Sequence, residues 1–261
     1  MKIRRRRHAV DDCPVRVREK IRAVLEERLA LMAPARRLRL ALAEEALYSL
    51  QGGSPARVLD AGCGDGLLTL SLAQRHPGWD LIGIDRRDDM LEGARRRAGA
   101  RSLGNVSFVH GDLEGPLPGG GFDAVLAIEC LSEIPDDRLA LRMLASALRP
   151  GGLLVVHVPE RSWRPVLPGS SGTWREQVRQ GYGAEELSLA IRGADLEGVE
   201  VRPTYRTVAA AAQEIRDRVK GSALLVRLAA FPFLAAAVHL ERRGITYGRP
   251  KALIATARRP S

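Results

Sequence analysis

The sequence predicts an α/β protein with a doubly wound parallel sheet, and three observations support this fold class. Short apolar runs alternate with helical stretches through the middle of the chain. A glycine-rich turn follows the first apolar run, and acidic residues end the next ones. The chain has 261 residues, of which 45% are hydrophobic and 28% charged, as expected for a globular domain with an appendage.

The N-terminal part is predicted to be a tail followed by helices. Residues 1–13 carry a basic run with no apolar stretch behind it, so we expect a flexible tail and no secretory signal. Across 14–53, apolar residues recur at helical spacing in two successive runs, which end at Gly52 and Gly53. These helices are expected to form either a lid or a dimer contact, which leaves an oligomer open.

Residues 54–160 are predicted to form the sheet and the helices that cover it. The apolar runs are RVLDAG, DLIGID, VSFVHGD, FDAVLAIE and LLVVHVPE. Helices are expected over 67–75, 89–98 and 137–148, and the turn LRPGG ends the last of them. Right-handed crossovers bring the carboxyl ends of parallel strands to one edge of the sheet, where we expect the ligand.

Residues 161–261 are predicted to hold a substrate loop, lid helices and closing strands. The expected elements are a helix over 185–193, a strand over 198–202, helices over 208–243 and a strand over 251–257. The most apolar stretch, 222–240, is interrupted by Arg227, Pro232 and His239, which argues against a membrane span. We expect a lid over the substrate pocket; the alternative is peripheral association with an anionic membrane.

The charge and the cysteines bound the setting of the protein. A net charge of +10 favours an anionic neighbour, such as nucleic acid, a membrane or an acidic substrate. The alternative is a solvated, arginine-rich surface. Three scattered cysteines are too few for a disulfide framework or a zinc site, which indicates a reducing, cytoplasmic location.

The glycine-rich turn lies in the segment VLDAGCGDG at 58–66. Glycine permits positive φ angles and lets a ligand approach the backbone closely. The spacing is G-x-G-x-G with Asp60 before it, whereas dinucleotide-binding turns have G-x-G-x-x-G. A carboxylate here would repel a pyrophosphate and attract a cation. The turn therefore favours a cationic ligand over a dinucleotide.

Two further carboxylates follow the next strands. Asp85 closes LIGID, where a carboxylate accepts from both ribose hydroxyls. Asp112 follows VSFVH, where it would accept from an adenine amino group while Leu113 offers its backbone. Each aspartate taken singly could instead cap a helix or a turn. Three of them at successive strand ends predict a single pocket for a cationic adenosine ligand.

From Val58 to Glu160 the chain resembles class I S-adenosylmethionine-dependent methyltransferases of the small-molecule type. The matching stretches are VLDAGCGDG, LIGIDRRDDML, HGDLEGPLPGGGFDAV, AIECLSEIPDD and LRPGGLLVVHVPE. The resemblance implies a Rossmann-like, seven-stranded sheet with an antiparallel last strand. The implied cofactor is S-adenosyl-L-methionine, and the implied product is S-adenosyl-L-homocysteine.

The resemblance also implies which residues contact the cofactor. These are Asp60, Gly62, Cys63 and Gly64 at the methionine end, Asp85 and Arg86 at the ribose, Met90, Asp112 and Leu113 at the adenine, and Ile128 and Glu129 closing the site.

The segment after the fourth strand offers a candidate base. Residues 128–136 resemble the I-E-V-L-E-H-I-P-D stretch of ubiquinone-type O-methyltransferases, some of which bind a divalent metal through its glutamates and histidine. This chain keeps Glu129 but has Ser132 and Glu133 at the other two positions, so we expect no metal. Glu129 and Glu133 would share a helix face if a helix begins here. Glu133 is a candidate general base.

Three further residues are candidates on the acceptor side. His157, near the end of the fifth strand, is either a second candidate base or a half-buried structural histidine. Residues 159–186 end in a stretch similar to the H-V-R-x-G-Y-T-P-E-E-L segment of sugar, lipid and quinone methyltransferases. In it, Arg179 and Tyr182 would either hold an anionic or hydroxylated substrate or tie down the loop.

Together these patterns predict an enzyme that methylates a hydroxyl of a small molecule: a sugar, polyketide, quinone-like phenol or lipid-linked glycan, as in natural-product biosynthesis. The alternatives are an RNA methyltransferase, a non-catalytic S-adenosylmethionine-binding protein and a nicotinamide-dependent oxidoreductase. Against nucleic acid, N-P-P-Y and Pro-Cys motifs are missing after the fourth strand, and aromatic residues make up only 4%. Against nicotinamide stands the G-x-G-x-G spacing.

Overall fold

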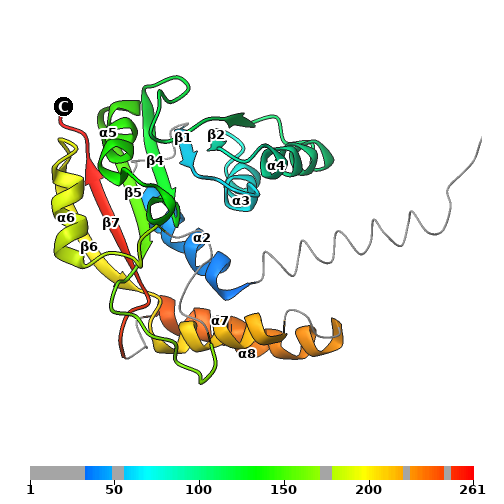
Figure 1. Ribbon diagram of the computed structural model, residues 1–261. Coiled ribbons are helices and arrows are strands. Elements are labelled where there is room, and N and C mark those ends of the chain that lie inside the picture. The colour runs from blue at the N-terminus through cyan, green and yellow to red at the C-terminus, as the bar shows by residue number, and fades with distance from the viewer. Residues whose placement is uncertain (1–32, 49–55, 171–177, 220–223, 244–247) are drawn as a thin grey trace, which may run out of the picture.

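The computed structural model describes residues 33–48, 56–170, 178–219, 224–243 and 248–261 (Figure 1). The predicted tail over 1–13, the first N-terminal helical run and the glycines that end the second run lie outside the described residues.

A seven-stranded sheet forms the centre of the molecule (Figure 1). Its strands are β1 (Arg57–Ala61), β2 (Asp80–Asp85), β3 (Val106–His110), β4 (Phe122–Ile128), β5 (Leu148–Pro159), β6 (Glu197–Thr204) and β7 (Ala252–Arg258). They lie in the order β3-β2-β1-β4-β5-β7-β6, and β7 runs antiparallel to both β5 and β6. The predicted doubly wound sheet with an antiparallel last strand is confirmed.

Helices cover both faces of this sheet, and two further helices lie beside it. They are α2 (Pro34–Leu47), α3 (Leu67–Arg75), α4 (Asp88–Ala100), α5 (Asp137–Ala147), α6 (Ala184–Arg192), α7 (Thr207–Val219) and α8 (Leu224–Arg242). Side chains of α5 and α6 share a buried cluster with one face of the sheet, and side chains of α2 and α3 share another with the opposite face. Adjacent residues of β1 show the alternation, since Val58 lies in the second cluster and Leu59 in the first. The apolar runs of the sequence are continuous because both faces of these strands are covered.

The C-terminal helices form a separate layer beside the sheet. Helices α7 and α8 contact each other, and both contact α2 (Figure 1). Pro232 lies inside α8. Within the described ranges, no helix is long and apolar enough to cross a membrane.

One local prediction is confirmed in part and another is wrong. The segment LRPGG does follow the end of α5 at Ala147, but it belongs to β5 rather than to a turn before it, and the register of β5 against β4 shifts between the pairs formed by Phe122 and Ala124. Glu129 and Glu133 do not share a helix face. Glu129 has φ of 64°, which is incompatible with a right-handed helix, and only the short 3₁₀ turn η2 (Leu131–Glu133) precedes α5.

The glycine-rich turn joins β1 to α3 with three residues in the left-handed region. Gly62, Gly64 and Gly66 have φ of 70°, 55° and 70°. A Cβ atom on Gly62 would stand 2.4 Å from the Cβ of Cys130, whereas one on Gly64 would meet only the tip of Arg87, at 3.5 Å. Packing therefore restricts Gly62 more strongly than Gly64, although both share the same backbone requirement.

We expect Gly62→Ala to lower the free energy of unfolding by about 2–4 kcal/mol, because it adds a steric clash to the cost of a left-handed alanine. Gly64→Ala is the matched control and should cost about 1 kcal/mol, for the backbone alone. Urea unfolding of both variants measures the difference. Equal losses would show that the contact with Cys130 does not restrict the turn.

Candidate functional site

A cavity of about 350 Å³ opens at the carboxyl ends of β1, β2 and β4. All of the positions that the resemblance assigns to the cofactor line it: Asp60, Gly62, Cys63, Gly64, Asp85, Arg86, Met90, Asp112, Leu113, Ile128 and Glu129. Parallel strands with a common direction bring these residues together from segments far apart in the sequence. We call this space the first cavity.

Asp85 connects the end of β2 to the glycine turn. One carboxylate oxygen accepts from the backbone N–H of Gly64 at 2.7 Å, and the other accepts from the backbone N–H of Arg87 at 3.0 Å. The side chain is only 4% exposed. Asp85 is therefore held in one orientation at the cavity wall by groups of the protein itself.

Asp60 is the most deeply buried carboxylate of the first cavity. Its side chain is 2% exposed and accepts a hydrogen bond of 2.6 Å from the hydroxyl of Thr69. Burial raises the pKa of Asp60 to about 6; the bond from Thr69 opposes this rise, and the negative charges of Asp85 and Asp65 add to it. An acid of this kind favours a cationic neighbour, which would stabilise its ionised form.

Asp112 and Leu113 lie on the far side of the same cavity, after β3. Leu113 is buried, and a carboxylate oxygen of Asp112 accepts from the backbone N–H of Glu114 at 3.0 Å. Asp112 thus forms the turn contact that was its alternative role, and it still lines the cavity.

The first cavity fits the group that the sequence predicts. Gly64 presents a backbone without a side chain, and a Cβ atom there would project towards the cavity-lining Arg87. The acids Asp60, Asp85 and Asp112 line the space; the first two are buried and Asp112 is exposed. This combination suits a cationic nucleoside and opposes a pyrophosphate.

Glu129 stands between the first cavity and a second one of about 440 Å³, and it lines both. Its carboxylate lies 3.1 Å from the guanidinium of Arg39 and 2.7 Å from Nδ1 of His157. Burial acts to raise the pKa of Glu129, but Arg39 and His157 outweigh burial and lower it to about 2. Its φ of 64° places it in a strained backbone conformation, of the kind that is enriched at functional sites.

His157 is fully buried, at 1% exposure, rather than half-buried. Its Nε2 lies 3.1 Å from the hydroxyl of Thr204, so both ring nitrogens contact the protein. The side chain also lines the second cavity. The geometry combines the two alternatives from the sequence, because a histidine held in place by Glu129 and Thr204 borders a cavity.

Glu133 lines the first cavity, after the carboxyl end of β4. No group of three histidine, cysteine, aspartate or glutamate side chains that could hold a metal occurs in the described part of the chain. Burial raises the pKa values of Cys63 and Cys130, which keeps both thiols protonated and unreactive at neutral pH.

Helix α2 lies across both cavities. Arg36 pairs with Asp65 of the glycine turn at 2.8 Å, and Arg39 pairs with Glu129. Leu40 lines the first cavity and Ala35 lines the second. This placement favours the lid over the dimer contact among the roles considered for the N-terminal helices.

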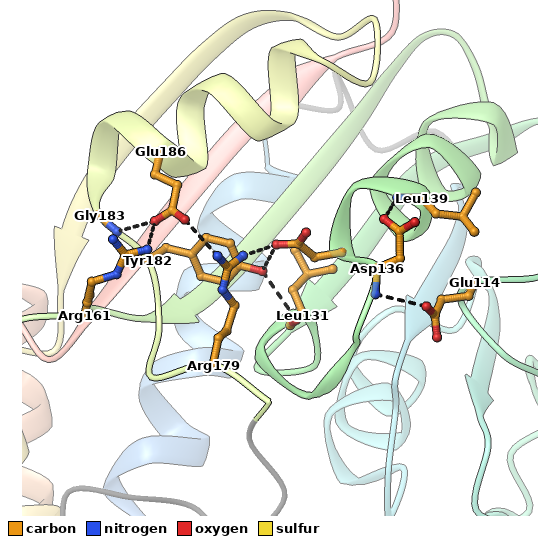
Figure 2. A network of polar contacts seen from close by, with 10 residues as sticks. Glu114, Leu131, Asp136, Leu139, Arg161, Arg179, Tyr182, Gly183 and Glu186 are labelled. Carbon is orange, nitrogen blue, oxygen red and sulfur yellow. Dashed lines mark hydrogen bonds and ion pairs between the residues drawn. The ribbon is translucent and has the colours of Figure 1, made fainter.

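Arg179 and Tyr182 lie away from both cavities, in the polar network of Figure 2. Arg179 forms ion pairs with Asp137 and with Glu186, the latter at 2.8 Å. The hydroxyl of the buried Tyr182 donates to Asp137 at 2.7 Å, and Arg161 pairs with Glu186 from the other side. These contacts join the loop to α5 and α6, which favours the structural alternative for both residues.

Sequence reasoning missed three residues that shape the site. Arg39 and Arg87 line the first cavity, and Lys251 lines the second. Arg39 interrupts the apolar face of a helix, which is a signal, although a weak one among so many arginines. Lys251 is distinguished only by its place before β7, which the sequence does not relate to α2.

Comparison with known proteins agrees with this geometry. The family described as "Methyltransferase domain" matches residues 58–152. A trans-aconitate 2-methyltransferase of Deinococcus radiodurans is 40% identical over 50% of this chain and 45% of its own length. A demethylmenaquinone methyltransferase of Thermus thermophilus is 43% identical over 40% and 47%. The chain thus spans about half the length of these curated relatives.

Solved structures share the fold over more of the chain. The [4+2]-cyclase SpnF superposes with a TM-score of 0.60 and 27% identity, over 85% of this chain and 79% of its own. Phosphoethanolamine N-methyltransferase 2 of Haemonchus contortus, in complex with S-adenosyl-L-methionine, superposes with a TM-score of 0.59 and 18% identity, over 81% and 50%. Residues 58–152 thus match a methyltransferase domain within a sheet of the class I, S-adenosylmethionine-dependent fold, and S-adenosyl-L-methionine is the cofactor of this domain.

Removing the charge of Glu129 should destabilise the fold in a pH-dependent way. We expect Glu129→Gln to lower the free energy of unfolding at neutral pH by about 3 kcal/mol, because it leaves the partly buried Arg39 and the buried His157 without their carboxylate partner. The folded-state pKa of about 2 lies below the ordinary 4.5. The stabilisation is therefore complete above about pH 4.5 and is lost as the pH falls through about 2.

Urea unfolding at about pH 7, 5 and 3 measures the difference in the free energy of unfolding between the wild type and Glu129→Gln. The exposed Glu92, paired with Arg96 at 3.6 Å, supplies the control variant Glu92→Gln, which should change stability by less than about 0.5 kcal/mol. A difference that stays constant from pH 7 to 3 would contradict the assigned role of Glu129.

Proposed function

We propose that the chain is a methyltransferase that transfers the methyl group of S-adenosyl-L-methionine to a hydroxyl of a small molecule. The observation that carries the proposal is the pair of adjoining cavities that share Glu129 and Arg39. The first has the cofactor residues, and the second has room for an acceptor. Two relatives are named for trans-aconitate and demethylmenaquinone, which supports a small-molecule acceptor. Sugars, polyketides, quinone-like phenols and lipid-linked glycans remain the acceptor classes to test.

In this proposal each group of predicted residues contacts a different part of the cofactor. Asp60 and the turn formed by Gly62, Cys63 and Gly64 hold the methionine end. Asp85 and Arg86 hold the ribose, and Met90, Asp112 and Leu113 hold the adenine. Ile128 and Glu129 close the first cavity towards the second.

The bound cofactor supplies a methyl group on a positively charged sulfur. An acceptor oxygen would bond to the methyl carbon as the carbon–sulfur bond breaks, and the electron pair of that carbon–sulfur bond would stay on sulfur. The hydroxyl proton passes to a base or to water. The contribution of the chain is to align acceptor and methyl group and to exclude water, and alignment alone accounts for much of such catalysis.

Glu133 and His157 are the proposed bases, and they differ in position. Glu133 lines the first cavity, while His157 lines the second and is held by Glu129 at 2.7 Å. A carboxylate at Nδ1 fixes the orientation of an imidazole. Arg179 and Tyr182 are left out of the proposed acceptor site, because their contacts point to α5 and α6.

A second candidate function keeps the cofactor and changes the reaction. The structurally similar SpnF is named a [4+2]-cyclase. A chain of this fold could bind S-adenosyl-L-methionine while doing other chemistry or none, since the fold alone does not determine the reaction. Methyl transfer to any acceptor would decide against this candidate.

Cofactor binding is expected to follow the ionisation of Asp60. The raised pKa of about 6 means that Asp60 is protonated below that pH, and binding a cation then requires release of the proton. Calorimetry should show binding of S-adenosyl-L-methionine that is constant above about pH 6 and weakens by up to about tenfold per pH unit below it. Asp60→Asn should bind more weakly with little pH dependence. Binding of NAD without S-adenosyl-L-methionine would contradict the proposal.

Turnover should identify the base. In a screen of phenols, sugars and glycans with labelled cofactor, we expect Glu133→Gln or His157→Gln to lower kcat by about 100-fold, as for loss of a general base. Affinity for S-adenosyl-L-homocysteine, measured in parallel, controls for damage to the first cavity. Unchanged kcat in both variants would exclude both residues as the base.

A further inference from the structure

The second cavity brings together residues from distant parts of the chain. Helix α2 contributes Arg39, β5 contributes His157, and Lys251 comes from the start of the last strand. Because Arg39 and Glu129 line both cavities, a molecule in the second cavity would lie next to the cofactor in the first.

The lining of the second cavity has an excess of positive charge. Its cationic side chains are Arg39, Arg161, Arg164 and Lys251, and its carboxylates are Glu129 and Glu160. Both carboxylates already accept from groups of the protein, Glu129 from Arg39 and His157, and Glu160 from the hydroxyl of Ser162 at 2.7 Å. Two of the cations are engaged as well, since Arg39 pairs with Glu129 and Arg161 pairs with Glu186. Cationic side chains still outnumber carboxylates in the lining, and a walled space with this balance attracts an anion.

Lys251 lines this cavity beside two aromatic rings. Its ammonium nitrogen lies 4.5 Å from the ring centroid of Trp163 and 5.1 Å from that of Tyr205. Burial lowers the pKa of Lys251, while the charges of Glu129, Glu214 and Asp217 oppose this, and an anionic ligand would stabilise the charged form further. Two aromatic walls beside a cation suit an organic anion with a flat or apolar body better than a bare ion.

Backbone strain marks the same cavity independently. The described residues include four non-glycine positions with positive φ, and two of them, Glu129 and Tyr205, line this cavity. Tyr205 has φ of 60°, and its carbonyl accepts from the backbone N–H of Lys251 at 2.9 Å. This hydrogen bond keeps the strained Tyr205 next to Lys251.

We propose that the second cavity binds the methyl acceptor and selects acceptors that carry an anionic group, a carboxylate or a phosphate, which Lys251 holds between Trp163 and Tyr205. This inference rests on the proposed function in so far as the ligand is taken to be the methyl acceptor. The anion site itself depends only on the residues of the second cavity. The reacting oxygen would then lie towards Glu129, where the cavities meet.

The test compares matched probes on the full chain saturated with S-adenosyl-L-homocysteine. Calorimetry should show 4-hydroxybenzoate or phenyl phosphate binding at least about tenfold more tightly than neutral 4-hydroxybenzamide, as expected for one charge-assisted contact. The two anions distinguish a carboxylate site from a phosphate site. Lys251→Met should reduce this preference to less than about twofold, and Lys251→Arg should retain most of it.

The affinity for S-adenosyl-L-homocysteine should stay within about twofold in both lysine variants, because Lys251 does not line the first cavity. If Lys251→Met does not fold, Arg164→Gln, on the exposed loop, should still lower the preference about threefold. Equal binding of the amide and the anions, no binding of any probe, or an undiminished preference in Lys251→Met would overturn the inference. Failure of the wild type to bind the cofactor would instead count against the proposed function. The anion preference measured without cofactor would then still test whether the second cavity is an anion site.

Discussion

The carboxylate of Glu129, held between Arg39 and His157, is the interaction on which the arrangement of both cavities depends. It joins the end of β4 to the N-terminal helix α2 on one side and to the carboxyl end of β5 on the other. A buried carboxylate needs such partners, because desolvation would otherwise neutralise it or expel it from the interior. Glu129 makes these contacts from a strained backbone conformation, with φ of 64°.

The two cavities lie at the same edge of the sheet but are lined by charges of opposite sign. Around the first, acids from successive strands collect negative potential near the glycine turn. Around the second, Arg39 and Lys251 from near the two ends of the chain and Arg161 and Arg164 from the loop after β5 collect positive potential. The ion pair of Arg39 with Glu129 stands at their boundary, where one member of each charge faces both spaces. A donor that carries a cation and an acceptor that carries an anion would thus each meet a wall of the opposite sign.

The sequence predicts the first cavity well because strand ends are a local property. Once β1, β2 and β4 are recognised as parallel, Asp60, Asp85 and Ile128 must converge at one edge. Tyr182 shows the limit, since its partner Asp137 lies on a helix whose packing no local pattern reveals. Lys251 shows it more strongly: only the antiparallel insertion of β7 between β5 and β6 carries it to α2. Pairings across most of the chain's length leave no periodic trace in the sequence.

The position of β7 also orders the events of synthesis. By residue 159 a ribosome has produced β1 to β5 with every acid of the first cavity, and these strands are adjacent in the order β3-β2-β1-β4-β5. Strand β5 then presents an open hydrogen-bonding edge until Ala252 and its successors arrive to pair with it. The residues of the first cavity are therefore synthesised early and those of the second cavity last. A nascent or truncated chain would have the cofactor site beside an unpaired, aggregation-prone strand edge.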